Sequence, residues 1–203
     1  HKEYRRQRQM CIRDRDMTEQ TVREQILAAA DELYYRKGYA AVGMDELRAA
    51  AGVSLRRLYA LFPSKTDIVT AVLARKHGEW ESGLTGAVAD AGADPRDRLL
   101  AVYGYLEDWF CTDDFRGCAF INAFGELGGT NPEVAKIVRD HKASFQAYMA
   151  GLVVAAGAPA SLAAQLSILA EGAQSTAAIA ADPQVAVQAR NAAEVLIDAA
   201  VAS

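Results

Sequence analysis

The stretch Met44-Asp-Glu-Leu-Arg-Ala-Ala-Ala-Gly-Val-Ser-Leu-Arg-Arg-Leu-Tyr-Ala-Leu-Phe-Pro-Ser-Lys-Thr-Asp67 decides the fold, because it contains two short helical patterns joined by a tight turn. In the first pattern, apolar side chains recur at helical spacing and form one face. Gly52 supplies the permissive backbone that a sharp turn needs, and Ser54 is a favourable N-cap for the next helix. We expect that helix to run from about Leu55 to Phe62, where Pro63 stops it.

The second helical pattern separates apolar from basic side chains. Leu58, Leu61 and Phe62 are apolar, whereas Arg56 and Arg57 lie on or near the outer face. A short helix with a buried stripe and exposed arginines, placed after a glycine turn, is typical of a helix-turn-helix. The pattern therefore predicts a helix that is shaped to enter the major groove of DNA.

A longer segment, ILAAADELYYRKGYAAVGMDELRAAAGVSLRRLYALFPSKTDIV at residues 26–69, resembles the N-terminal domain of the TetR family of bacterial transcriptional regulators. The matching marks are AA…L…KGY in the first helix, AGVS at the turn, LY..F in the second helix of the motif, and PSK after it. Val42 and Gly43 depart from the family pattern, because small hydroxylated residues often stand there, and Arg48 replaces a frequent alanine. These departures put a phosphate contact in doubt, but not the fold.

Composition and length favour an all-α chain. The 203 residues are 51% hydrophobic, largely through alanine, with only five prolines. No apolar run approaches the roughly 20 residues that a membrane-spanning helix needs. No secretory signal is visible, so we expect a cytoplasmic protein with free thiols at Cys11, Cys111 and Cys118. We see no metal-ligand spacing, phosphate loop or catalytic constellation, and we therefore expect neither a cofactor nor an enzyme.

The charges divide unevenly between the two parts of the chain. Residues 1–76 hold 15 Lys and Arg against 10 Asp and Glu, whereas residues 77–203 hold 7 against 16. The net charge of −4 thus combines a basic head of +5 with an acidic body of −9. This distribution is typical of a DNA reader joined to a domain that does not bind DNA.

We expect three parts in chain order. Residues 1–16 are either a basic, disordered arm or a non-native extension, because they are arginine-rich and unpatterned. Residues 17–64 form a three-helix DNA-binding domain, and residues 65–203 form a helical body for effector binding and dimerisation. Glycines accumulate over residues 78–95, where we expect the head to give way to the body. The nine expected helices span about 18–37, 44–51, 55–62, 65–86, 95–111, 117–127, 132–156, 162–181 and 183–200.

The candidate DNA contacts divide into base readers and positioning residues. Arg56 and Arg57 are the best base readers, because a guanidinium pairs bidentately with guanine. Leu55 either meets a thymine methyl group or belongs to the core. The family resemblance implies phosphate contacts from Tyr59 and Lys65, although Tyr59 is alternatively plain core. The full set of DNA-binding candidates is Arg48, Ser54, Leu55, Arg56, Arg57, Tyr59 and Lys65.

Apolar stripes in the last two helices suggest a homodimer. Two helix-turn-helix heads read two half-sites across a dyad, and the resemblance implies that the last two helices of each subunit form a four-helix bundle. The alternative is that these stripes pack only within one subunit. The expected interface residues are Leu162, Leu166, Leu169, Ala173, Ala177, Leu196 and Ile197.

Aromatic residues gather in the middle helices, together with a few polar residues, as in many small-molecule pockets. Ordinary core packing explains each aromatic residue about equally well, and Asn122 is equally consistent with a cap or a surface position. We expect His141 to be exposed, because it lies between Asp140 and Lys142. The candidate pocket residues are Tyr103, Trp109, Phe110, Phe120, Asn122, Phe124, Tyr148 and Gln174.

We interpret the sequence as a TetR-like, DNA-binding transcriptional regulator. The resemblance implies a repressor that binds a palindromic operator as a dimer and is relieved by an unknown small-molecule effector. The alternatives are an activator of the same family, or a helical ligand-binding protein whose head no longer binds DNA. The sequence leaves open the operator, the effector, the regulated genes and the sign of regulation.

Overall fold

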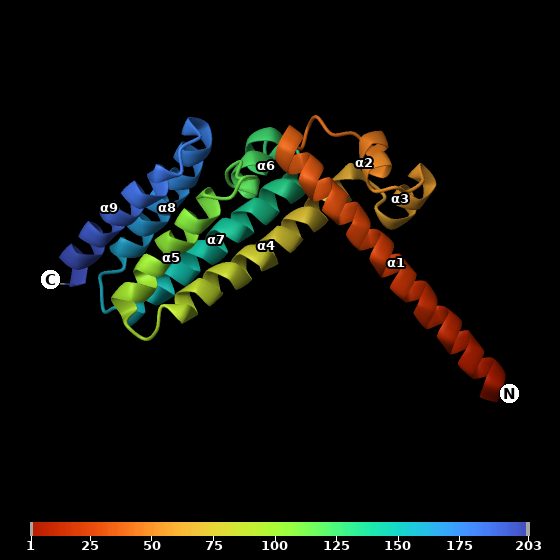
Figure 1. The fold of residues 1–203 in the computed structure, drawn as a ribbon, viewed down its shortest axis with the longest axis horizontal. Coiled ribbons are helices and arrows are strands. Elements are labelled where there is room, and N and C mark those ends of the chain that lie inside the picture. Colours follow the sequence, from red (N-terminus) through yellow and green to blue (C-terminus); the bar gives the residue numbers. More distant parts are fainter. Residues whose placement is uncertain (1, 202–203) are drawn as a thin grey trace. The chain divides into compact units, whose positions relative to one another are not determined.

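The structure is a computed structural model that describes residues 2–201, with side chains from residue 19 onwards. Every regular element in this range is a helix, which confirms the predicted all-α class (Figure 1). The first helix was expected over 18–37 but begins at Lys2, so the backbone of residues 2–16 is helical in the structure instead of disordered. Whether residues 1–16 are native stays a prediction. The nine helices within residues 2–201 are α1 (Lys2–Lys37), α2 (Met44–Ala50), α3 (Leu55–Leu61), α4 (Lys65–Asp90), α5 (Pro95–Phe110), α6 (Ala119–Leu127), α7 (Pro132–Ala155), α8 (Ser161–Ala180) and α9 (Gln184–Val201).

Internal contacts divide the chain into two compact units, His1–Val72 and Leu73–Ser203. The division falls within α4. In the first unit, α2 packs on both α1 and α3 around a core that includes Ile26, Leu47 and Leu58, each with no exposed surface. The turn between α2 and α3 depends on Gly52, whose φ of +66° lies in the left-handed region that side chains disfavour.

Helix α4 continues through Gly78, Gly83 and Gly86 to Asp90, although we expected it to end near Gly86. Glycine inside a helix costs about 1 kcal/mol relative to alanine, which is why the sequence suggests a break. Burial outweighs that cost here, because Leu84 and Val88 of the last turns lie in the core of the second unit. Gly83 also has a packing role, since a Cβ atom there would lie 2.9 Å from the Tyr105 hydroxyl.

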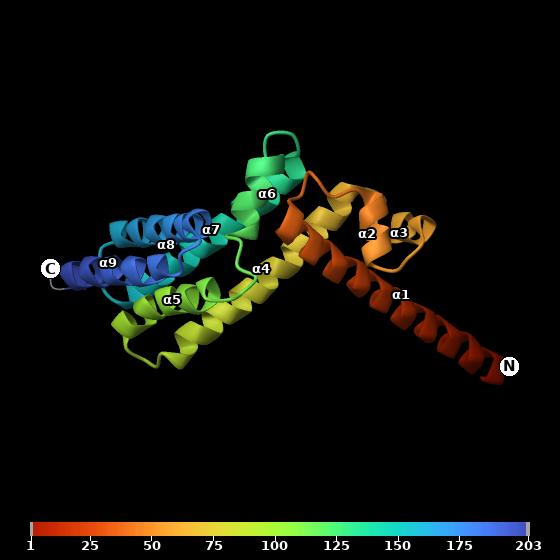
Figure 2. The same cartoon turned by 45° about the horizontal axis from the view of Figure 1, so that its top comes forward.

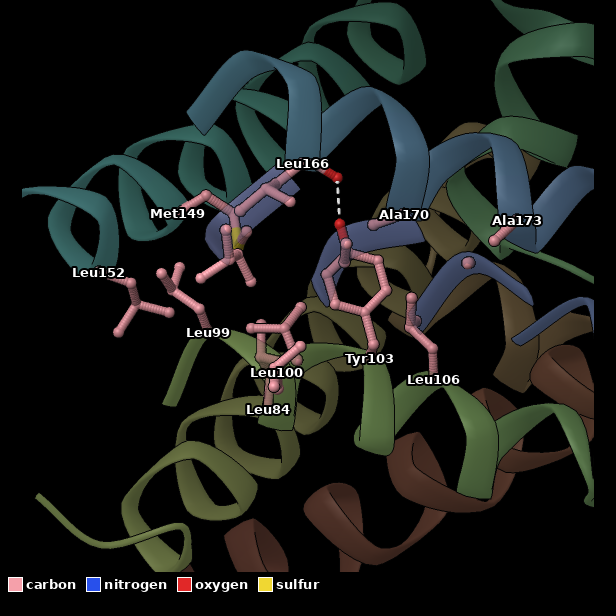
Figure 3. Close-up of a cluster of buried hydrophobic side chains, with 14 of the residues drawn as sticks. Leu84, Leu99, Leu100, Tyr103, Leu106, Met149, Leu152, Leu166, Ala170 and Ala173 are labelled. Atoms are coloured by element: carbon pink, nitrogen blue, oxygen red, sulfur yellow. Dashed lines mark hydrogen bonds between the residues drawn. The ribbon is translucent and has the colours of Figure 1, made fainter. Parts of the chain in front are cut away.

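In the second unit, α5 packs against α7, α8 and α9, and α8 packs against α7 and α9 (Figures 1 and 2). Tyr103 of α5 lies fully buried at the centre of this core, where its hydroxyl donates a 2.8 Å hydrogen bond to the Leu166 carbonyl of α8 (Figure 3). Burial raises the pKa of the Tyr103 phenol, which keeps it protonated as the donor.

Side chains cap the first turns of α5 and α7, but not that of α8. Asp94 and Asn131 cap α5 and α7, each followed by a proline at the first helical position. Ser161, however, does not cap α8, because it is already the first residue of the helix and Ala160 precedes it without a side-chain bond. Arg96 at the start of α5 forms ion pairs with Glu194 and Asp198 of α9, which joins the ends of these two helices.

We expect Tyr103→Phe to lower the free energy of unfolding by about 0.5–1.5 kcal/mol, because it removes one buried hydrogen bond and leaves the ring in place. Urea denaturation measures this change. Tyr148→Phe is the control and should cost less, since Tyr148 is only partly buried against the same core. Equal stability of Tyr103→Phe and the parent would contradict the assigned bond.

Candidate nucleic-acid interface

Helix α3 has only seven residues, and each of its ends is held by specific contacts. The Ser54 hydroxyl accepts a 3.2 Å hydrogen bond from the Arg57 backbone N–H, as a helix N-cap should. Leu58 is fully buried, and Phe62, directly after the helix, is 1% exposed. These contacts fix one side of α3 to the unit and leave the other side open.

The open side of α3 carries most of the predicted DNA contacts. Arg56 is exposed, and Tyr59 is 45% exposed, so its ring is not core. Leu55 at the start of the helix is 37% exposed, which favours the surface over the core. No hydrogen bond or ion pair joins the Arg56 side chain to another residue within 19–201. The exposed face thus combines a guanidinium, a phenol and an aliphatic group.

Helix α1 contacts both ends of α3 through side chains that the sequence pattern did not predict. Arg23 donates to the Leu61 carbonyl at 3.3 Å, and its guanidinium lies 4.2 Å from the centre of the Phe62 ring. One turn earlier in α1, Glu19 pairs with Arg57 at 3.3 Å. Glu19 and Arg23 are four residues apart, so they lie on the same face of α1. This spacing is the signal in the sequence that could have indicated that both side chains contact the same neighbour.

The remaining candidate cations also have defined neighbours in the first unit. Arg48 of α2 pairs with Asp45 at 2.9 Å, three residues earlier on the same helix. Lys65, at the start of α4, donates to the Ala40 carbonyl at 3.1 Å. Ser64 and Asp67 cap α4 reciprocally, because each side chain accepts a hydrogen bond from the other's backbone N–H.

The predicted pocket residues fall into two aromatic clusters in the second unit. In the first, the rings of Trp109, Phe110 and Phe115 are in contact, with Phe110 and Phe115 centres 4.7 Å apart. In the second, Phe120 stacks on His141 with ring centres 3.5 Å apart. The prediction thus assigned residues of two separate clusters to one pocket, because helical spacing does not show which helices pack together.

The other pocket candidates are partly committed to local contacts. Asn122 donates to the Arg116 carbonyl, and the buried Gln174 donates to the Ala170 carbonyl one turn earlier. Tyr148 is half-buried beside the core. Phe124 is 43% exposed, so it lies at the surface instead of inside an enclosed site.

His141 is buried, which corrects the expectation that it is exposed. Only 5% of its surface is accessible, because it faces into the bundle even though Asp140 beside it is exposed. Its Nδ1 lies 3.0 Å from the Nδ1 of His77 on α4, so one ring must donate and the other accept. The ring of Trp80 also meets His141 edge-on, 4.8 Å between centres. Burial, the Lys142 ammonium and His77 lower the pKa of His141 to about 3.

A cluster of polar side chains, Lys142, Glu171 and Cys118, lies beside the helices α7 and α8. The Lys142 ammonium is 3.6 Å from the Glu171 carboxylate and 3.8 Å from the buried Cys118 thiol. The other Glu171 oxygen is buried and bonds no residue in the described range. Charged and polar atoms are therefore present inside the largely apolar second unit.

The predicted interface stripe of α8 and α9 faces the unit's own core instead of the surface. Leu162, Leu166 and Ile197 are 0–2% exposed, and Ala173 and Ala177 are also buried. Leu169 and Leu196 pack partly against the same core. The large apolar side chains that α8 and α9 leave exposed are others, namely Ile168 at 72%, Ile179 at 88%, Val195 at 68% and Val201 at 51% exposure.

Two further site types find no support in the described part of the chain. No group of three or more His, Cys, Asp or Glu side chains between residues 19 and 201 is arranged to hold a metal ion. None of the helices described combines the length and apolar character that spanning a bilayer requires.

Comparison with known proteins gives a family match in the first unit. The profile of a family described as bacterial regulatory proteins, tetR family, matches residues 26–72. The transcriptional activator FasR of Mycolicibacterium smegmatis is 38% identical over 117 residues, which are 58% of this chain and 52% of FasR. The transcriptional repressor NemR of Escherichia coli is 30% identical over 111 residues, or 54% of this chain and 56% of NemR. The chain thus matches about half the length of these curated relatives.

Two solved structures extend the likeness over most of the chain. A TetR-family transcriptional regulator from Streptomyces coelicolor superimposes with a TM-score of 0.84 at 26% identity, covering 89% of this chain and 90% of the other. A chain described as a tetR transcriptional regulator from Streptomyces avermitilis is 32% identical with a TM-score of 0.75, covering 88% of this chain and 97% of the other.

Stability should fall on acidification because of His141. Its pKa in the folded protein, about 3, lies below the ordinary value of 6.5, so the unfolded chain binds the additional proton between these pH values. The free energy of unfolding should then decrease by up to about 1.4 kcal/mol per pH unit as the pH falls from 6.5. Urea denaturation at several pH values between 3 and 6.5 measures how the free energy of unfolding changes with pH. This free energy should fall less steeply with decreasing pH for His141→Phe than for the parent. An equally steep fall in both would contradict the buried neutral ring.

Proposed function

Because the chain belongs to the TetR family of bacterial regulatory proteins, we propose that it is a transcriptional repressor that binds a palindromic operator as a homodimer and releases it when a small molecule binds the helical body. The observation that carries this proposal is the exposed face of α3, with Arg56 and Tyr59 outward and Leu58 buried. A helix presented in this way fits a DNA major groove.

The proposed division of labour on DNA follows from chemistry. Arg56 and Arg57 read guanine, because a guanidinium donates two parallel hydrogen bonds to its O6 and N7 atoms. Tyr59, Lys65 and Arg48 contact phosphates and fix the position of α3, while Leu55 meets a thymine methyl group. The basic balance of residues 1–76 supports this assignment, because cations supply most of the affinity for any DNA sequence.

The proposed dimer uses the outward face of α8 and α9. Ile168 and Ile179 are eleven residues apart, which is close to three helical turns, so they share one face of α8. Val195 is similarly exposed on α9. Exposed aliphatic groups on two neighbouring helices favour a two-fold, self-complementary contact, and a dimer explains why the operator would be an inverted repeat.

The effector would bind in the second unit. Its aromatic clusters and the Lys142–Glu171 pair provide the mixture of apolar and polar groups that small molecules require. An effector weakens DNA binding only if it prefers a state of the dimer whose recognition helices do not match the operator spacing. We propose that α4 transmits this preference, because it is the helix in which the two units meet along the chain.

The sign of regulation rests on analogy. One curated relative is a repressor and another is an activator, so activation is the alternative within the same family. A helical ligand-binding protein that no longer binds DNA is the alternative from another class. The exposed, unpaired Arg56 side chain favours DNA binding over that alternative, because within residues 19–201 it has no structural partner.

Selection from a random duplex library should enrich an inverted repeat with the 203-residue chain. The Arg56→Ala, Arg57→Ala double variant should bind that repeat at least about 10-fold more weakly, because each guanine contact contributes about 1–3 kcal/mol. Fluorescence anisotropy at one stated salt concentration measures the loss. The matched control is Arg139→Ala, Arg190→Ala, which removes two exposed arginines from α7 and α9 and should bind normally. Equal losses in both variants would contradict a specific role for α3.

Ile168→Asp should dissociate the dimer, because a carboxylate would be buried twice in a two-fold interface. We expect the dimer dissociation constant to rise about 30-fold or more in analytical ultracentrifugation. Val154→Asp is the control, since Val154 on α7 is 73% exposed and Ile168 is 72% exposed. An Ile168→Asp variant that stays as dimeric as the control would rule out this face.

A further inference from the structure

Two neighbouring arginines of α3 have different surroundings. The Arg56 side chain is exposed and pairs with no side chain in residues 19–201, whereas Arg57 Nη1 lies 3.3 Å from the Glu19 carboxylate of α1. Both members of this pair are partly accessible, with 39% of the Arg57 side chain and 49% of the Glu19 side chain exposed. One of the two proposed base readers is thus already occupied before DNA arrives.

The pair lies at the end of α3 that approaches DNA. Arg57 is the third residue of α3, three positions after the Ser54 cap, and the helices of such motifs contact bases with their N-terminal residues. Glu19 lies beside this first turn, whereas Arg23, one turn further along α1, contacts the last residues of the α3 segment. The Glu19 carboxylate is consequently close to the place where phosphates and base edges would lie.

The pair is not needed to hold α3 in place. The fully buried Leu58 and the Arg23 contacts with Leu61 and Phe62 already fix the helix to α1. An exposed ion pair contributes little to folding, because water and salt screen it. A carboxylate in this position does, however, compete directly for the same guanidinium that a DNA complex requires, and it repels phosphates.

We propose that Glu19 is an intramolecular competitor of DNA for Arg57, so that it sets the affinity of the recognition helix. This inference rests on the proposed function, namely DNA binding through α3. In the free protein Glu19 occupies the Arg57 guanidinium, and binding to DNA exchanges this carboxylate for a base edge or phosphate. Because the Glu19–Arg57 ion pair must be broken first, every DNA complex is weakened by the free energy of that pair. In the free protein the same pair competes with other anions for Arg57.

The test is a double-mutant cycle on the selected duplex, measured by anisotropy at a salt concentration where all variants bind. Glu19→Gln should bind about two- to five-fold more tightly than the parent, the range that an exposed ion pair supports. Glu32→Gln removes an equal charge from the same helix, where Glu32 pairs with Arg36 at 3.2 Å, and it should leave affinity unchanged. Thermal denaturation checks that both variants fold as the parent does.

The cycle then asks whether Glu19 acts through Arg57. The gain from Glu19→Gln should disappear in an Arg57→Gln background and persist in an Arg56→Gln background. A gain that persists without Arg57 would overturn the proposal, because it would reflect plain charge repulsion. Weaker binding of Glu19→Gln would also overturn it, since Glu19 would then position Arg57 for DNA. Absence of DNA binding by the parent chain would overturn the proposed function itself, and this inference with it.

Discussion

The proposed DNA-reading surface depends on one constraint, which is that a seven-residue helix does not hold its own shape in water. Helix α3 is therefore stable only because its neighbours hold it. Its own Leu58 is buried in the core, Ser54 caps its first turn, and Arg23 of α1 binds the carbonyl at its last residue. Without these contacts α3 would not stay helical, and its exposed side chains would lose their fixed arrangement.

The neighbours of α3 also determine which of the candidate cations form ion pairs in the free protein. Among the candidate DNA contacts, Arg48 pairs with Asp45 and Arg57 pairs with Glu19, whereas Arg56 is left to the solvent. The cations are thus present but partly compensated within the free unit, which tempers their attraction for any polyanion. Under the proposed function, affinity and selectivity depend on which of these ion pairs a DNA site can exchange for contacts of its own.

Local signals in the sequence predicted local features well. The helix start at residue 95 and the glycine turn at Gly52 are reproduced, because caps and turns act over a few residues. Features decided by distant packing were missed. Gly86 does not end α4, since burial of Leu84 and Val88 outweighs the glycine cost, and neighbouring charges in the sequence gave no sign that His141 is buried against Phe120.

The predicted interface residues of α8 and α9 show again that sequence periodicity does not determine packing partners. Leu162 and Leu166 repeat at helical spacing, and that spacing predicts a buried face without stating whether the subunit or its partner buries it. In the structure the subunit buries them, and Ile168 and Ile179 remain outside. Periodicity thus identified a helix with an apolar face, but only the packed fold separates the core side chains from those available to a second copy.

The most direct test of this account is the structure of the protein bound to a selected duplex. The account predicts one α3 in each of two successive major grooves, with Arg56 and Arg57 at base edges and Arg23 still joined to the end of the helix. A complex in which α3 lies outside the groove, or in which another surface of the chain contacts the bases, would contradict it.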